Sequence, residues 1–232
     1  MKIRYLGHSA VAVEHQDTTV VVDPFMTGGP WVKTVPADLQ PTTILLTHGH
    51  EDHVGDAVAL SKKHNAPVVA MFELANRLAE LGAEVVHCGL GGRIKHAWGW
   101  SKLVPAWHSS SFHGKYMGTP AGVVFEVGGR VFYHAGDTCI FSDMKLIAEL
   151  YKPEIMFLPI GGAFTMDVFE AVKAIEFVSP RFAIPIHYNT FEAINQDPEE
   201  FRREVESRFS TRVQVMEPLD SWEIPSPVTS SR

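Results

Sequence analysis

The chain has 232 residues, of which 45% are hydrophobic and 20% are charged, and its formal net charge at pH 7 is −7. This composition excludes an intrinsically disordered chain, because the apolar content is enough to offset the entropy of ordering. The acidic balance argues against nonspecific nucleic-acid binding, which depends on clustered lysine and arginine. The two cysteines are too few for a disulfide framework. With no apolar run of membrane-helix length and no secretory signal, we expect a cytoplasmic protein.

The first 90 residues predict a small meander followed by alternating strands and helices. Segments rich in β-branched residues, separated by turn residues, predict antiparallel strands at 2–6, 10–14 and 19–22. Glycines and prolines over 27–41 predict a loop. The elements expected after this loop are a strand at 43–46, a helix at 55–65, a strand at 67–71, a helix at 72–81 and a strand at 84–87.

The remaining chain repeats this pattern, with strands first and then alternation. Strands are expected at 92–97, 102–106, 122–127 and 130–133, and Gly128-Gly129 predicts a hairpin. The later elements are a helix at 142–150, a strand at 155–158, a helix at 167–178, a strand at 182–186, a helix from 197, and strands at 212–215 and 221–224. We expect one domain over 1–224, a frayed tail at 225–232, and two similar halves packed sheet to sheet.

The densest group of metal-ligating residue types lies at 47–53, where the sequence is Thr-His-Gly-His-Glu-Asp-His. Imidazole and carboxylate groups suit Zn²⁺, Mn²⁺ or Fe²⁺. His48 and His50 are two residues apart, so an extended backbone can aim both at one ion, with Gly49 permitting a tight turn. Asp52 and His53 can then reach a second ion. A solvated polar loop is the alternative interpretation of this segment.

Three further candidate ligands follow predicted strands. His108 comes after the strand at 102–106, Asp137 after the strand at 130–133, and His187 after the strand at 182–186. Active sites built on sheets commonly form where several strand ends converge on one rim. The sequence therefore predicts a metal site at such a rim.

The order of these motifs resembles that of the metallo-β-lactamase superfamily, over almost the whole chain from residue 5 to residue 191. The finer resemblance is carried by Gly7-His8-Ser9-Ala10, Ala135-Gly136-Asp137-Thr138, Phe164-Thr165-Met166 and His187-Tyr188-Asn189-Thr190-Phe191. These segments are similar to a branch of small metal-dependent hydrolases of bacteria and archaea, related to the ascorbate-6-phosphate lactonases. The resemblance implies an α/β fold, a four-layer αββα sandwich, which agrees with the two halves predicted above.

The resemblance also implies a role for each candidate ligand. The expected groups are His48, His50 and His108 for one ion, Asp52, His53 and His187 for a second, and Asp137 as a bridge between the two. The expected cofactors are two divalent ions, zinc first, with manganese, nickel or iron as alternatives. Such a pair lowers the pKa of a shared water, so the expected nucleophile is a metal-bridged hydroxide. Asp52 is the expected catalytic residue, orienting that hydroxide and shuttling a proton.

Five other residues are candidates for contact with the substrate or with the ligands, namely His8, His113, His134, Tyr188 and Asn189. His134 either donates to a ligand carboxylate or is an ordinary strand histidine. Tyr188 and Asn189 either donate to a developing oxyanion or hold their loop in place. Cys139 is expected to be a buried small hydrophobe rather than a ligand.

The leading prediction is a metal-dependent hydrolase that attacks an ester, lactone or phosphodiester bond of a small molecule, including an anionic one. A nucleic-acid-processing nuclease is one alternative, but no basic arm supports it. A mononuclear iron enzyme acting on thiols and a non-catalytic metal-binding module are the others. A homo-oligomer is compatible with the sequence, with Trp31, Tyr116 and Met117 at an interface or at the entrance of the site.

Overall fold

The computed structural model describes residues 1–226, which contain two seven-stranded sheets. The strand order of the first sheet is β16-β1-β2-β3-β4-β5-β6, so the last strand of the chain pairs with the first. The predicted meander is confirmed, because β1, β2 and β3 pair antiparallel in sequence. The strands of this sheet are β1 (Lys2–Gly7), β2 (Ala10–His15), β3 (Thr18–Val22), β4 (Thr43–Leu45), β5 (Val68–Met71), β6 (Val85–Cys88) and β16 (Ser221–Glu223).

The second sheet has the order β15-β14-β13-β12-β11-β8-β7. The predicted hairpin at Gly128-Gly129 is confirmed, since it joins the antiparallel pair β11 and β12. A separate short hairpin of β9 (Ser111–Phe112) and β10 (Lys115–Tyr116) stands apart from both sheets. The strands of the second sheet are β7 (Arg93–His96), β8 (Gly99–Pro105), β11 (Ala121–Val127), β12 (Arg130–His134), β13 (Ile155–Pro159), β14 (Phe182–Ile186) and β15 (Arg212–Val213).

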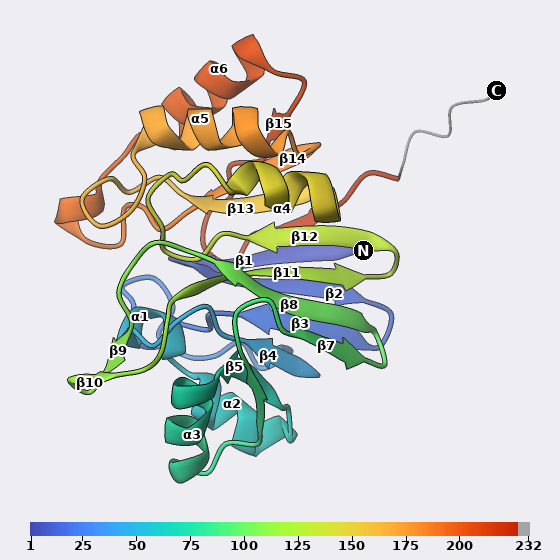
Figure 1. The fold of residues 1–232 in the computed structure, drawn as a ribbon, viewed down its shortest axis with the longest axis vertical. Coiled ribbons are helices and arrows are strands. Elements are labelled where there is room, and N and C mark those ends of the chain that lie inside the picture. Colours follow the sequence, from blue (N-terminus) through green and yellow to red (C-terminus); the bar gives the residue numbers. More distant parts are fainter. Residues whose placement is uncertain (227–232) are drawn as a thin grey trace.

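Helices cover the outer side of each sheet (Figure 1). Those beside the first sheet are α1 (Glu51–Val54), α2 (Ala57–His64) and α3 (Phe72–Glu80); those beside the second are α4 (Met144–Tyr151), α5 (Val168–Val178) and α6 (Pro198–Arg208), with a single 3₁₀ turn at Glu192–Ile194. Each of the last two helices has an aspartate cap, because Asp167 accepts from the backbone N–H of Glu170 and Asp197 from that of Glu199. The four-layer αββα sandwich is confirmed.

Two apolar cores hold the layers together, and the strands of the second sheet contribute to both. Val123 and Phe125 of β11 belong to the core between the sheets, whereas Val124 belongs to the core under α4, α5 and α6. Strand β13 alternates in the same way, with Phe157 on the inner face and Leu158 on the outer face. Successive side chains of a strand point to opposite faces, so a strand covered on both faces is apolar throughout.

The strand directions bring several polar turns to one rim of the sandwich. In the first sheet β1, β3 and β4 run in the same direction, and in the second sheet so do β8, β12 and β14. Their carboxyl ends are followed by His8, Asp23, His48, His108, Asp137 and His187. The predicted convergence of strand ends is therefore present, and it draws on both sheets.

The helix predicted at 55–65 differs from the structure at its start. A helical turn, α1, already begins inside the His-rich segment at Glu51, and Gly55 separates it from α2. Gly55 has a φ of 38°, and a Cβ there would lie 2.5 Å from the carbonyl oxygen of Pro24. The chain therefore needs glycine at this point to pack the loop after β3 against the ligand segment.

One expectation about the rim loops is wrong. Cys139 is exposed rather than buried, because it lies beyond the end of β12 on a loop that faces solvent. Of the predicted tail, residues 227–232 lie outside the described part of the chain, and 225–226 belong to no helix or strand. None of the helices within residues 1–226 combines the length and hydropathy that crossing a lipid bilayer requires.

Candidate metal centre

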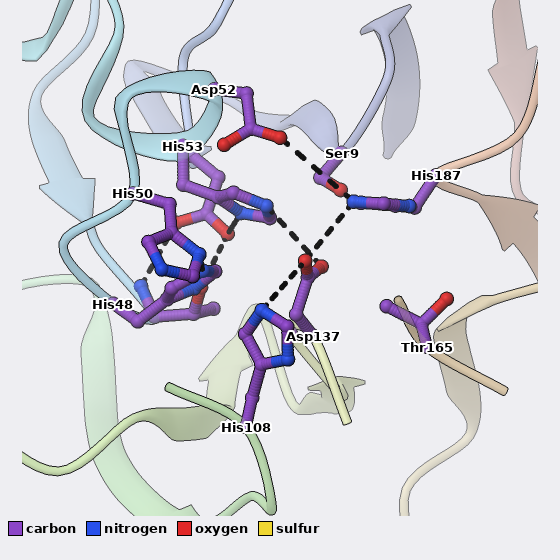
Figure 2. A network of polar contacts seen from close by, with 12 residues as sticks. Ser9, His48, His50, Asp52, His53, His108, Asp137, Thr165 and His187 are labelled. Atoms are coloured by element: carbon purple, nitrogen blue, oxygen red, sulfur yellow. Dashed lines mark hydrogen bonds and ion pairs between the residues drawn. The ribbon is translucent and has the colours of Figure 1, made fainter. Parts of the chain in front are cut away.

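Three imidazoles from two strand ends form the first group of candidate ligands. His48 and His50 follow β4, and His108 follows β8; their ligand atoms all lie within 4.8 Å of one another. The Nε2 atom of His48 is 2.9 Å from the Nδ1 atom of His50. The structure thus brings together the three residues predicted for one ion (Figure 2).

The second group lies beside the first and includes the start of α1. Asp52, His53 and His187 have ligand atoms within 4.8 Å of one another, together with a nitrogen of His8. The side chain of His53 is fully buried, whereas Asp52 is partly open to solvent. The sequence predicted these three ligands but left the role of His8 open.

Asp137 lies between the two groups, at the position that the family resemblance implies for a bridge. Its Oδ1 atom is 3.2 Å from Nε2 of His53, and its Oδ2 atom is 3.0 Å from Nε2 of His187 and 3.5 Å from Nε2 of His108. Dashed lines in Figure 2 mark these contacts. One buried carboxylate therefore faces histidines of both groups.

The polar atoms at the centre of the cluster fit divalent metal ions. Nε2 of His53 and Oδ1 of Asp137 are buried and close, yet their alignment is not that of a hydrogen bond, so neither has such a partner. Buried polar atoms are nearly always paired, and a shared cation would pair both. Imidazole and carboxylate are the ligands that zinc takes in catalytic sites.

The protonation states of the first group of imidazoles and of Asp137 suit metal binding. Burial lowers the pKa values of the His48, His50 and His108 side chains, which keeps these imidazoles in the neutral form that binds metals. Burial opposes ionisation of Asp137, but His187 and His53 outweigh it and hold the pKa of this carboxyl well below its ordinary value. The carboxylate is therefore charged.

Comparison with known proteins agrees with this geometry. The family model of the β-lactamase superfamily domain matches residues 2–187. A UPF0173 metal-dependent hydrolase of Thermus thermophilus is 50% identical over 202 residues, which cover 87% of this chain and 89% of that protein. The chain belongs to the UPF0173 family of metal-dependent hydrolases, within the β-lactamase superfamily. The resemblance to the metallo-β-lactamase superfamily is thus confirmed.

Other UPF0173 relatives and a solved structure extend over nearly the full length. The UPF0173 protein of Methanosarcina barkeri is 42% identical over 228 residues, which cover 97% of this chain and 99% of the relative. The structure of Igni18, a metallo hydrolase of Ignicoccus hospitalis, matches with a TM-score of 0.88 and 36% identity, covering 97% of this chain and 99% of that one. The similarity therefore includes both halves of the sandwich.

Asp23 is a buried residue of the site that sequence reasoning missed in this UPF0173 chain. Its carboxylate accepts from the backbone N–H of Thr47 (2.9 Å), from the Thr47 hydroxyl (2.6 Å) and from Nδ1 of His53 (2.7 Å). His48 Nδ1 lies 3.0 Å from the same hydroxyl oxygen, so it donates to Thr47. Both imidazoles therefore direct Nδ1 at this network, and their Nε2 atoms face the cluster, where a metal ion would bind.

His8 proves to be part of the centre, because it holds Asp52. Its Nε2 atom lies 3.1 Å from Oδ2 of Asp52, and its Nδ1 atom lies 2.7 Å from the hydroxyl oxygen of Thr190. Burial lowers the pKa of His8 to about 4, so the ring is neutral at pH 7 and has one donor. A carboxylate only accepts, so Nε2 donates to Asp52 and Nδ1 accepts from Thr190.

We expect His8→Ala to weaken zinc binding by about 10- to 100-fold, the usual cost of removing a partner that orients a metal ligand. The substitution leaves Oδ2 of Asp52 without its donor, so the carboxylate is free to rotate away from the second group. Competition with a chromophoric chelator measures the affinity. His87→Ala is the matched control, because His87 is exposed and bonded to Asn76 far from the cluster. Equal affinities of the His8 variant and the parent would contradict the assignment.

The remaining candidates lie around the cluster rather than within it. His134 donates from Nε2 to the carbonyl oxygen of Ser9 (2.9 Å) and accepts at Nδ1 from the N–H of Gly136 (3.2 Å). It is thus a satisfied strand histidine that fixes the backbone next to Asp137. His113 is exposed, with its ring stacked on Phe112 and its Nε2 atom 3.9 Å from a Glu51 oxygen. The structure does not bring His113 to the ligands.

Tyr188 and Asn189 face away from the ligands. Both line a separate cavity of about 350 Å³ behind the His187 loop, together with Trp31. The side-chain oxygen of Asn189 accepts from the N–H of Gln196 at 2.8 Å, so this residue holds its loop in place. The positions of Tyr188 and Asn189 therefore favour a role in holding the loop in place over contact with a developing oxyanion.

Gly49 and Met117 meet under the first group of ligands. A Cβ on Gly49 would lie 2.6 Å from the Cβ of Met117, which is buried, and the φ of Gly49 is not positive. Glycine is therefore needed here because the backbone at Gly49 lies close to Met117. The expected reason, a tight turn that requires glycine, does not apply. Met117 supports the ligand segment from below instead of lining an entrance.

Proposed function

We propose that this UPF0173 chain is a hydrolase of small molecules, which uses two divalent ions, zinc first, to cleave an ester, lactone or phosphodiester bond. One observation carries the proposal: the Asp137 carboxylate lies within 3.5 Å of Nε2 atoms of His53, His108 and His187, which belong to both groups of candidate ligands. The names of its relatives, metal-dependent hydrolases and a metallo hydrolase, support the same class of reaction.

A cavity above the cluster gives a substrate access to it. The cavity has a volume of about 210 Å³ and is lined by His50, Asp52, His108, Ser109, Asp137, Phe164, His187 and Phe191. Five of these eight residues are candidate metal ligands, so a bound molecule touches the centre directly. The small volume favours a small molecule, or one reacting group of a longer one.

When bound, the ions supply a nucleophilic water at neutral pH and Lewis acidity towards the substrate oxygen. The side chains of the protein orient the groups that take part in the reaction. His8 fixes Oδ2 of Asp52 by a hydrogen bond, which lowers the pKa of this carboxyl against the effect of its burial. The charged Asp52 side chain borders the cavity, so it is placed to accept a proton there and to pass it on. The two free cysteines, Cys88 and Cys139, fit the cytoplasm as the compartment.

The test is hydrolysis by zinc-loaded protein of nitrophenyl esters, aliphatic lactones and bis(nitrophenyl) phosphate. We expect turnover of at least one class, its loss with a chelator, and its return with zinc. Asp52→Asn should lower kcat by about 100-fold or more, because the amide cannot accept the proton.

Glu51→Gln is the matched control for the Asp52 variant. It removes one negative charge from the neighbouring position, but Glu51 is exposed and does not border the cavity. Its kcat should equal that of the parent. Absence of turnover for all three substrate classes, or turnover that a chelator leaves untouched, would contradict the proposal.

A further inference from the structure

The cavity above the metal cluster is continued by a second one. This neighbour has a volume of about 440 Å³ and shares His108 and Ser109 with the first. Trp107, Tyr116 and Pro120 are among the residues that line it. A molecule longer than the first cavity can therefore extend past His108 into the second.

The walls of both cavities are uncharged apart from the cluster itself. Their carboxylates are Asp52 and Asp137, both candidate metal ligands, and no lysine or arginine among residues 1–226 lines either space. Proteins that bind phosphate groups usually place arginine or lysine on them. Here an anionic substrate would find positive charge at the metal ions alone.

Exposed aromatic rings replace the missing cations. Phe164, after β13, is 62% exposed, and Phe191, on the loop after β14, is 45% exposed; both line the cavity over the cluster. The Phe191 ring packs edge-on against His8 with centroids 5.8 Å apart, which ties it to the metal centre. Trp107 and Tyr116 are 66% and 69% exposed in the second cavity. Large exposed rings around a cleft indicate apolar ligands.

We propose that the substrates are neutral carboxylic esters or lactones with an apolar chain, which lies against Phe164 and Phe191 and extends towards Trp107. This inference rests on the proposed function and narrows it. Water leaves both the chain and the rings when they meet, which favours the apolar substrate. A phosphodiester would lose hydration of its charge against the same walls without a cationic side chain in return.

The test compares nitrophenyl hexanoate with nitrophenyl acetate on the zinc-loaded protein. We expect kcat/KM to be higher for hexanoate, and the ratio of the two values to fall by about tenfold in Phe164→Ala and in Phe191→Ala. Phe169→Ala is the matched control, because Phe169 is 80% exposed on α5 and lines no part of either cavity. Its ratio should equal that of the parent.

A binding measurement separates recognition from catalysis. Methyl hexyl ketone is neutral and has no bond to hydrolyse, so its contact with zinc-loaded protein can be followed by saturation-transfer NMR. We expect transfer to its alkyl protons, weakened in the Phe164 and Phe191 variants and unchanged in Phe169→Ala. Equal transfer in all four proteins would overturn the proposal.

The outcomes also distinguish this inference from the proposed function. A higher kcat/KM for bis(nitrophenyl) phosphate than for either ester would overturn the inference and leave the hydrolase standing. No metal-dependent turnover of any of these would remove the proposed function itself. If the alanine variants instead change the oligomeric state by size-exclusion chromatography, the rings form an interface between copies of the chain, and the inference is wrong.

Discussion

Replacing Asp137 by alanine is expected to lower the metal content from the proposed two ions per chain to one or none and to abolish hydrolysis. The loss of activity should exceed the roughly 100-fold cost of removing a residue that only orients a ligand. The reason is geometric: this carboxylate faces His53, His108 and His187 together, so no neighbour can replace it. Mass spectrometry of the metals in protein purified without chelators measures the content directly.

The control for this variant is Asp143→Ala. Asp143 is exposed before α4, and its carboxylate contacts only Ser142 among the described side chains. Its metal content and activity should equal those of the parent. One iron per chain in the parent, retained after the Asp137 substitution, would contradict a bridged pair of ions. That result would instead favour the mononuclear iron enzyme acting on thiols.

Replacing Asp23 by alanine should cost about 3–5 kcal/mol of the free energy of unfolding, because several buried donors lose their acceptor at once. Asp23 is fully buried, and its loss leaves the Thr47 N–H, the Thr47 hydroxyl and Nδ1 of His53 without their acceptor. Urea denaturation in the presence of a chelator measures this cost apart from any contribution of bound metal.

Two further variants test whether the loss of stability in Asp23→Ala depends on the buried carboxylate. Asp23→Asn keeps an oxygen for Thr47 but presents no charge to His53, so its stability should lie between those of the alanine variant and the parent. Asp17→Ala changes an exposed aspartate of the β2–β3 turn and should cost less than about 0.5 kcal/mol. A cost below about 1 kcal/mol for Asp23→Ala would show that the network does not depend on this carboxylate.

The elements and the positions of the candidate ligands were predictable from local sequence, whereas the grouping of those candidates around two ions came from the family resemblance. A strand covered on both faces is apolar throughout, as in Ile155–Pro159, and turn residues mark where it ends. Histidine and aspartate after such strands are residue types that bind metal ions. Since the ends of strands running in one direction meet at one rim, His48, Asp137 and His187 were expected together.

Side chains that depend on contacts between distant loops were not predictable in the same way. Asp23 also follows a strand, but an aspartate before a proline is typical of a turn, and its partner His53 is 30 residues away. Tyr188 follows a ligand, but a φ of 55° at His187 turns the loop so that Tyr188 faces the other side. Exposure of Cys139 likewise depends on the path of its loop rather than on its own chemistry.

The two halves of the sandwich deliver their candidate ligands at different times during synthesis of the chain. A ribosome finishes the strand that delivers His48 long before the one that delivers His187, and the contact of His8 with Thr190 joins residues 182 positions apart. Contacts of such sequence separation form late in folding, because closing the intervening loop costs entropy first. Until the second half is made, the nascent chain would hold only four of the seven candidate ligands, so the complete set forms only when the chain is nearly finished.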